Sequence, residues 1–160
     1  MDVDTFRELL SHWAATVGII AVRDDDRVYG TTITSFTPVA TDPPLVLVSL
    51  GPHAQVLPFL TEGTQYAINL LHESQADLAH VYADSFPVGP SPFPDTGTPT
   101  IEGALTALSC VVTGVVTVEG GGRLVLGRVT EGTPPGGRRP LLWYRRASTT
   151  LAADDLPGLD

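Results

Sequence analysis

Apolar residues near the start of the chain recur at intervals of three or four, the spacing that aligns side chains on one face of a helix. The residues of this stripe are Phe6, Leu9, Leu10 and Trp13. Asp4 or Thr5 stands where an N-cap is needed, and Glu8 can reach back to complete a capping box. The N-terminal segment is therefore predicted to form an amphipathic helix.

Shorter apolar runs separated by turn signals predict β-strands over much of the remaining chain. The predicted strands cover residues 17–23, 28–35, 45–50, 66–71, 109–119, 123–130 and 140–144. The first two flank the polar turn RDDDR and are expected to form a hairpin. The run 45–50 is bounded by Pro-Pro and Gly-Pro, which favours a fully buried strand. Pro58 limits residues 53–60 to a helical turn or two.

A second helix is predicted to begin at Ser74, with Leu78, Val81 and Tyr82 on one face. The loop 86–100 that follows is rich in Pro and Gly, which forbids a regular element. It is expected to cross the body of the protein, anchored by Phe86 and Phe93, although a disordered loop fits the composition equally well. The acidic tail 152–160 is expected to fray.

These elements predict a mainly β protein, a small β-barrel with inserted helices, because the strands alternate with short turns and not with βαβ crossovers. The chain has 160 residues, 42% of them hydrophobic. That length and composition fit one domain, residues 1–160, with a buried core. The triplet GGG at 120–122 joins two predicted strands, so we interpret it as a hairpin turn and not as a phosphate loop.

Charge and composition exclude several classes of function. The chain has only 9 Lys and Arg and a net charge of -9, which argues against a nucleic-acid surface. The N-terminus lacks the basic flank of a secretory signal, and no apolar run reaches the length of a membrane span. We therefore expect a soluble cytoplasmic protein without nucleic-acid or membrane partners.

The sequence offers no evident catalytic or metal-ligating group. Cys110 lies in a strand pattern and is expected to be a buried apolar residue. None of the four His residues lies in a nucleophile or metal motif, and no disulfide framework is possible with one Cys. His72 and His80 are expected near a helix surface. No metal site and no catalytic side chain are predicted.

The segment TSFTPVATDPPLVLVSL, residues 34–50, combines hydroxyl side chains, a rigid Asp-Pro-Pro and an apolar run. Pro43 and Pro44 fix the backbone and form a corner that cannot pair as a central strand. Such a corner could present backbone groups to the edge of a planar polar ligand. On pattern alone an ordinary barrel corner is the stronger interpretation.

Several motifs together resemble, in order, those of the flavin reductase-like family, the FMN-binding split barrels that serve two-component monooxygenases. GTTITSFTPV at 30–39 is similar to the family's G-M-T-[AV]-[SN]-S-F-x-x-[VP] strand, and TDPPLVLVSL at 41–50 to its S-x-D-P-P-L-V segment. FRELLSHWAATVGIIAV resembles the opening helix and strand, and YAINLLHESQADLAHVYAD the F-x-V-N-V-L block. ALTALSCVV, LVLGRV and RPLLWYRR resemble the later strands. The likeness covers nearly the whole chain.

The resemblance implies a homodimeric, six-stranded, Greek-key split barrel that binds FMN or FAD. It also implies direct hydride transfer from NADH or NADPH to the flavin, without an acid–base residue. Thr32 to Ser35 would face the edge of the isoalloxazine ring, and the next segment would take the ribityl chain and phosphate. The implied flavin-binding residues are Thr32, Ile33, Thr34, Ser35, Ser49, Leu50, Gly51, His53, Ala54 and Gln55.

Three departures from the family pattern bear on function. The family often has G-D-H where this chain has Gly120-Gly121-Gly122, and that His lies near the nicotinamide. The family also has Ser and Thr where this chain reads HAQV at 53–56, so its phosphate contacts are weaker or arranged differently. Finally, Arg146-Ala147-Ser148 lacks the aromatic residue common in the family, and the additional Arg could meet a phosphate or a partner chain.

The leading hypothesis is an NAD(P)H-dependent flavin reductase that supplies reduced FMN or FAD by diffusion to a monooxygenase. A second hypothesis is a repurposed barrel that binds flavin without nicotinamide turnover and acts on a natural-product intermediate. A third is a non-catalytic partner of a monooxygenase. The sequence does not choose between FMN and FAD or between NADH and NADPH, and it does not identify the oxygenase.

Overall fold

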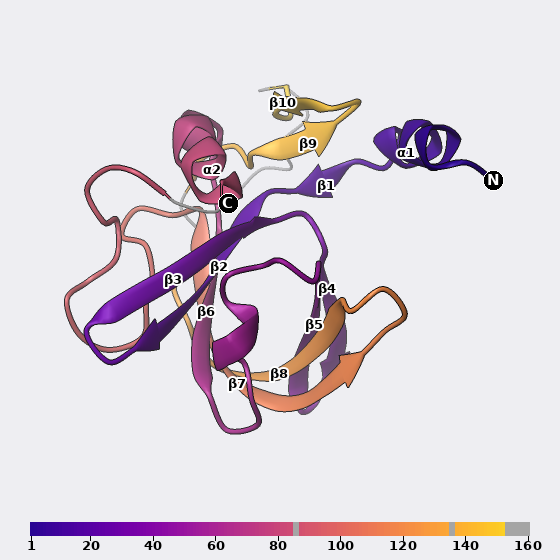
Figure 1. Cartoon of the computed structure of the whole chain (residues 1–160). Coiled ribbons are helices and arrows are strands. Elements are labelled where there is room, and N and C mark those ends of the chain that lie inside the picture. Colours follow the sequence, from indigo (N-terminus) through magenta and orange to yellow (C-terminus); the bar gives the residue numbers. More distant parts are fainter. Residues whose placement is uncertain (85–86, 135–136, 153–160) are drawn as a thin grey trace.

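The computed structural model describes residues 1–84, 87–134 and 137–152, and within them it is mainly β with two α-helices (Figure 1). The helices are α1 (Val3–Ser11) and α2 (Ala76–Ala83), and two short 3₁₀ turns are η1 (Leu57–Phe59) and η2 (Glu73–Gln75). The strands are β1 (Ala15–Thr16), β2 (Gly18–Asp24), β3 (Arg27–Ile33), β4 (Phe36–Thr41), β5 (Pro44–Leu50), β6 (Gln65–Leu70), β7 (Thr106–Thr117), β8 (Arg123–Gly132), β9 (Leu142–Tyr144) and β10 (Ala147–Thr149).

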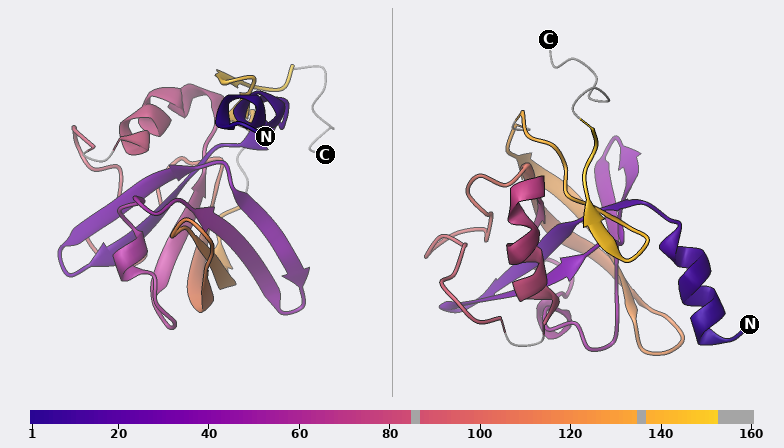
Figure 2. Two further views of the ribbon diagram at one scale, coloured as in Figure 1. Left: turned by 45° about the vertical axis from the view of Figure 1, so that its right-hand side comes forward. Right: turned by 90° about the horizontal axis from the view of Figure 1, so that it is seen from above.

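The main sheet is seven-stranded and antiparallel, in the order β3-β2-β6-β7-β8-β5-β4. Its two edge strands, β3 and β4, are consecutive in the chain and separated only by Thr34 and Ser35. Two residues cannot span an open seven-stranded sheet, because neighbouring strands lie about 4.8 Å apart. The sheet must therefore curl until the end of β3 lies beside the start of β4, and from there the two edge strands diverge and leave the barrel split between them (Figure 2).

Apolar residues fill two cores on opposite faces of the sheet. Ile20 and Val22 of β2 point into the barrel, whereas Ile19 and Ala21 of the same strand point to the outer layer. Since successive side chains of a strand alternate between faces, a strand buried on both faces carries an uninterrupted apolar run. This explains the continuous run GIIAV at the start of β2.

The outer layer consists of α2, the segment 87–105 and the small sheet β1-β9-β10. Residues 87–100 form no helix or strand, as their composition predicts, and Phe93 is buried in the outer core. The buried amide of Asn69 fixes this segment: Nδ2 donates to the Pro99 carbonyl, and Oδ1 accepts from the Ile101 N–H at 2.7 Å. The predicted anchor Phe86 and the tail from 153 lie outside the described residues.

Several local predictions were wrong. The N-cap of α1 is Asp2, whose carboxylate accepts from the Thr5 N–H, because the helix begins before Asp4. Glu8 does not complete a capping box with either predicted cap; it pairs with Arg146. His72 is only 3% exposed, since its ring lies beneath the turn that precedes β9.

The barrel sheet has seven strands and not six, because residues 36–41 turn back at Asp42-Pro43 and pair with β5. Pro44 begins β5 opposite Thr41, and the rigid corner expected at Asp-Pro-Pro is a hairpin turn at the sheet edge. The prediction that 45–50 is buried on both faces was wrong. Val46, Val48 and Leu50 are buried, but Ser49 between them is exposed.

Within the described residues, neither α-helix is both long and apolar enough to cross a membrane.

Candidate functional site

The free edge of β3 borders a cavity of about 300 Å³. β3 pairs only with β2 among the described strands, so its other edge leaves backbone N–H and C=O groups available. One wall is the loop after β5, and the opposite wall is the C-terminal end of α2. The lining residues are Thr31, Gly51, Pro52, His53, Ala54, Gln55, Tyr82, Ala83 and Asp84.

Four of the predicted flavin residues line this cavity together: Gly51, His53, Ala54 and Gln55. Their loop is held by backbone hydrogen bonds, with the Ala54 N–H donating to the Gly51 carbonyl at 3.1 Å. They are brought opposite β3 because β5 and β3 lie on the two sides of the split. The helical turn or two predicted over 53–60 is the single turn η1, which begins at Leu57.

The hydroxyl groups expected to face a ligand instead donate within the protein. Thr32 Oγ1 donates to the Ala79 carbonyl of α2 at 2.7 Å, and Ser35 Oγ donates to the Ser49 carbonyl. These hydroxyls retain only acceptor capacity for a ligand. Their main effect is structural, because the first ties α2 to β3 and the second ties the β3–β4 link to β5.

The remaining predicted residues divide between core and surface. Ile33 and Leu50 have side chains buried in the barrel core, so a ligand could reach only their backbone. Thr34 and Ser49 are exposed on the two segments that meet beside the split. The Ser49 N–H donates to the Ser35 carbonyl at 3.4 Å. The structure thus brings the 32–35 and 49–55 segments side by side, as the motifs imply.

Sequence reasoning missed the wall contributed by α2. Tyr82 was expected on the apolar face of its helix, and it does pack in the outer core, yet it also lines the cavity. Burial raises the pKa of Tyr82, so its hydroxyl stays protonated and can donate at neutral pH. A helix pattern identifies a buried face but not which end of that face borders a cavity.

The glycine turn that replaces the family's G-D-H motif joins β7 to β8, as predicted. Gly120 and Gly121 have positive φ angles of 85° and 81°, which favour glycine. A β-carbon on Gly121 would lie 3.5 Å from Cβ of Pro52, and one on Gly122 would lie 3.0 Å from the Leu50 carbonyl oxygen. The turn therefore packs against the loop that walls the cavity.

A further contact missed by sequence reasoning is made by Arg123. Its Nη1 donates to the Leu57 carbonyl of η1 at 3.1 Å. The side chain thereby fixes the far end of the loop that begins at Gly51. Within the described residues no cluster of three His, Cys, Asp or Glu could hold a metal ion.

Comparison with known proteins identifies the family. The sequence profile described as "Flavin reductase like domain" matches residues 10–152. The chain belongs to this family. Among its relatives is the reductase component of a 4-nitrophenol 4-monooxygenase/4-nitrocatechol 2-monooxygenase from Rhodococcus opacus, 34% identical over 91% of this chain and 79% of the relative. Another is the NADH-dependent flavin reductase StyB from Pseudomonas fluorescens, 30% identical over 90% of this chain and 88% of the relative.

Solved structures of flavin reductases superpose on nearly the whole chain. Flavin reductase PheA2 matches with a TM-score of 0.85 and 32% identity, covering 95% of this chain and 99% of the other. The flavin reductase of styrene monooxygenase from Pseudomonas putida S12 matches with a TM-score of 0.82 and 28% identity, covering 95% and 99%. The resemblance inferred from the ordered motifs is confirmed, and so is the mainly β split-barrel class.

The cavity of this flavin reductase-like chain fits the requirements of a flavin. The free edge of β3 can donate to and accept from the polar edge of a planar ring. The open position at Gly51, where a β-carbon would meet nothing within 4 Å, leaves room for a chain and a phosphate. His53 and Gln55 supply donors on the same loop. Hydrogen-bonding groups thus surround a cavity that is large enough to hold a ligand.

Proposed function

We propose that this protein is an NADH-dependent flavin reductase that supplies reduced FMN or FAD to a partner monooxygenase. The observation that carries the proposal is a cavity beside the free edge of β3, where Thr31 lies in one wall and the 51–55 loop in another. Thr31 belongs to the strand whose motif matches the family, and the loop directly follows the matching segment 41–50. Relatives described as NADH-dependent flavin reductases and as reductase components of monooxygenases support the same activity.

The flavin, when bound, would accept hydride from the nicotinamide and carry the redox chemistry. The protein's part is to bind and orient. The backbone of 32–35 would contact the ring edge, and the 51–55 loop would hold the ribityl phosphate. Because this chemistry needs close stacking of two rings more than a proton donor, the proposal assigns no acid–base residue.

The glycine turn is the feature that favours the second hypothesis, flavin binding without nicotinamide turnover. Gly122 occupies the position of the family's His, and it carries no side chain toward a nicotinamide. NADH turnover by the unchanged protein, whose turn carries no His, separates the two hypotheses. Gly122→His is not a simple restoration, because a β-carbon would lie 3.0 Å from the Leu50 carbonyl. We expect this variant to displace the loop wall and to bind flavin more weakly.

The decisive experiment is an absorbance assay of NADH oxidation with purified protein and added FMN or FAD. Turnover well above the rate without protein supports the reductase. Flavin binding seen by difference spectrum, without turnover, would support the repurposed barrel instead. If no flavin binds, capture of a monooxygenase subunit would leave only the non-catalytic role. A cytoplasmic location is part of the proposal, because the cytoplasm supplies NADH.

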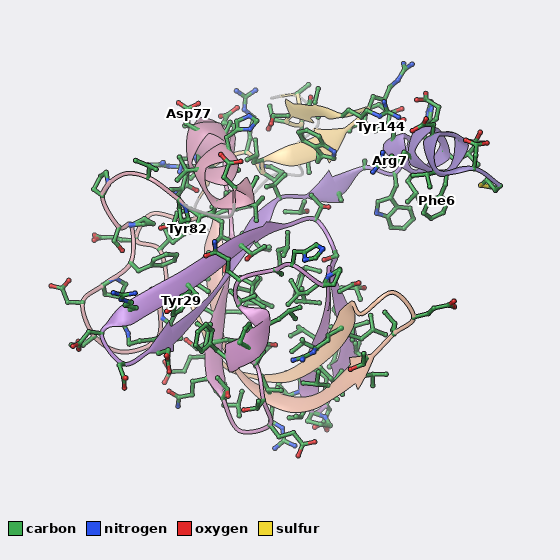
Figure 3. The ribbon with its side chains drawn as sticks, in the orientation of Figure 1. Phe6, Arg7, Tyr29, Asp77, Tyr82 and Tyr144 are labelled. Carbon is green, nitrogen blue, oxygen red and sulfur yellow. The ribbon has the colours of Figure 1, made fainter. Side chains whose placement is uncertain are left out.

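A homodimer is also part of the proposal, and α1 is its structural basis. The apolar residues of α1 are exposed, with Phe6 at 52%, Leu10 at 54% and Trp13 just beyond it at 72%. Figure 3 shows Phe6 pointing from α1 into open space beside the barrel. An exposed apolar stripe of this kind marks an association surface, and a second copy is the simplest occupant under two-fold symmetry.

The helix is held firmly enough to present that stripe. The Arg145 N–H donates to the Ser11 carbonyl at 2.7 Å, and Arg146 Nη2 lies 3.3 Å from Glu8 Oε2. Both arginines lie in the turn between β9 and β10, which packs against the polar side of α1. The additional Arg noted in the sequence thus contacts Glu8 of its own chain.

A further inference from the structure

The β7–β8 turn holds the start of the loop that walls the cavity beside β3. Gly121 and Gly122 of this turn lie against Pro52 and against the Leu50 carbonyl. A β-carbon at Gly122 would lie 3.0 Å from that carbonyl oxygen, closer than side chains normally come. The glycines that replace the family's G-D-H motif therefore let the turn pack closely on the start of the loop.

Arg123, the residue directly after this turn, holds the other end of the loop. It begins β8 and pairs with Leu50 across the sheet. Its side chain extends to η1, where Nη1 donates to the Leu57 carbonyl at 3.1 Å. Residues 50–57 are thus fixed at both ends by consecutive residues of one short segment. Arg123 itself is not among the residues that line the cavity.

The positive charge of Arg123 has no counter-charge among the residues that the structure describes. The side chain is only partly exposed, and it forms no ion pair with any described Asp or Glu. A guanidinium has five N–H donors, and the Leu57 carbonyl occupies one of them. Because a partly buried cation without a counter-charge is unfavourable, this arrangement favours binding of an anion near the loop.

The backbone of the loop offers donors for such an anion. The N–H groups of His53 and Gln55 have no acceptor within the described part of the chain, and both residues line the cavity. The segment HAQV at 53–56 lacks the hydroxyl side chains that the family has there. Backbone N–H groups therefore carry more of the contact with a phosphate, and their directions depend on how the loop is held.

We infer that Arg123 is a positioning residue that makes this loop select phosphorylated flavins. It fixes the loop through the Leu57 carbonyl and adds a positive charge beside it, which offsets the missing hydroxyls. The inference rests on the proposed function, because it assumes that a flavin occupies the cavity beside β3. Riboflavin has the same ring system as FMN but no phosphate. Comparing the two ligands therefore separates the hold on the phosphate from the hold on the ring.

The test measures dissociation constants of FMN and riboflavin by flavin fluorescence. The variants are Arg123→Gln, Arg123→Lys and the control Arg128→Gln, which changes an exposed arginine on the same strand. We expect Arg123→Gln to weaken FMN binding about tenfold, or about 1.4 kcal/mol, and to change riboflavin binding less than about twofold. Arg123→Lys keeps the charge and one donor, so it should lose less. Arg128→Gln should leave both constants unchanged.

Steady-state kinetics provide a second measurement. In Arg123→Gln the Michaelis constant for FMN should rise while kcat at saturating FMN stays the same, because uniform binding is lost and the reacting ring is held as before. Equal weakening of FMN and riboflavin would overturn the inference, since Arg123 would then support only the fold. Identical behaviour of Arg123→Gln and Arg128→Gln would overturn it as well.

If Arg123→Gln does not fold, as judged by circular dichroism, the unchanged protein decides through its salt dependence. Salt screens a contact that depends on charge, so a ratio of FMN to riboflavin affinity that falls with added KCl supports the inference, and a constant ratio overturns it. Preferential binding of FMN without NADH oxidation would overturn the reductase activity alone. If the unchanged protein binds neither flavin, both the proposed function and the inference are wrong.

Discussion

The ring of Tyr82 lies directly against the backbone of Gly30, where an added β-carbon would be 2.8 Å from ring atom Cδ1. This contact lets α2 pack on β3 closely enough for Thr32 Oγ1 to reach the Ala79 carbonyl. It also places Tyr82 in the wall of the cavity beside β3. A glycine in the family's strand motif thus positions one wall of the proposed site.

Gly30→Ala should displace Tyr82 and cost about 1–3 kcal/mol of unfolding free energy, the usual cost of overpacking. Because Tyr82 lines the cavity beside β3, flavin affinity should fall in the same variant. Urea unfolding and flavin titration measure the two effects. Gly114→Ala is the matched control, since a β-carbon there would meet nothing within 4 Å. Equal stability of the two variants would contradict the proposed packing.

Tyr66 presents a second close approach, in the barrel core. Its hydroxyl is buried and has no hydrogen-bond partner among the residues that the structure describes, and a β-carbon on Gly127 would lie only 1.9 Å from it. We expect Gly127→Ala to destabilise the fold strongly, by at least about 3 kcal/mol. Tyr66→Phe alone should be neutral or stabilising by up to about 1 kcal/mol, because it removes an unsatisfied polar group.

The double variant Gly127→Ala with Tyr66→Phe should recover part of the lost stability, as measured by a double-mutant cycle in urea. Strictly additive effects would show that the hydroxyl is not the obstacle.

Cys110, which packs in the same core, provides a related observation. Burial raises the pKa of its thiol to about 12, so it should resist thiol reagents until the protein unfolds.

His72 makes stability depend on pH. Burial is the main cause that lowers the pKa of His72. The second cause is the guanidinium of Arg138, whose Nη1 lies 2.7 Å from Nε2 of the His72 ring. The Glu73 carboxylate opposes the shift. The unfolded chain takes up this proton near the ordinary value of about 6.5, whereas the folded chain resists it. Unfolding free energy should therefore be highest above about pH 6.5 and decline as pH falls toward the lowered pKa.

Urea midpoints at about pH 7.5 and about pH 5.5 measure this decline. His72→Asn is the informative variant, because an amide side chain does not titrate. Its oxygen can still accept from the Ser74 N–H, which donates to His72 Nδ1 in the unchanged protein. Its midpoint should change less with pH than that of the unchanged protein. An identical pH dependence in both would assign the effect to other groups.

The exposed stripe of α1 predicts a defined change in assembly. Phe6→Glu combined with Trp13→Glu should convert a dimer to a monomer in sedimentation or light scattering, with little loss of stability because α1 buries no residue in the single chain. Val88→Glu is the control, since Val88 is 85% exposed but lies far from α1 in the chain. A dimer that survives the double substitution would place the interface elsewhere.

Much of the fold could be predicted from the chain alone. The continuous run of β2, the hairpin at RDDDR, the glycine turn between β7 and β8 and the irregular Pro-rich segment all depend on neighbours in sequence. Periodicity, β-branching and the conformational freedom of glycine act over a few residues, so they can be read locally. The resemblance also implied that residues of the 51–55 loop bind flavin, and these residues do line the cavity beside β3.

Only the tertiary structure decided which surfaces meet. The closure of the sheet placed the 51–55 loop opposite β3, and the packing of Tyr82 on Gly30 added α2 as a second wall. The turn before β9 covered His72, which the helical pattern left at the surface. These outcomes depend on shape and burial between segments far apart in the chain, and local periodicity contains no information about such contacts.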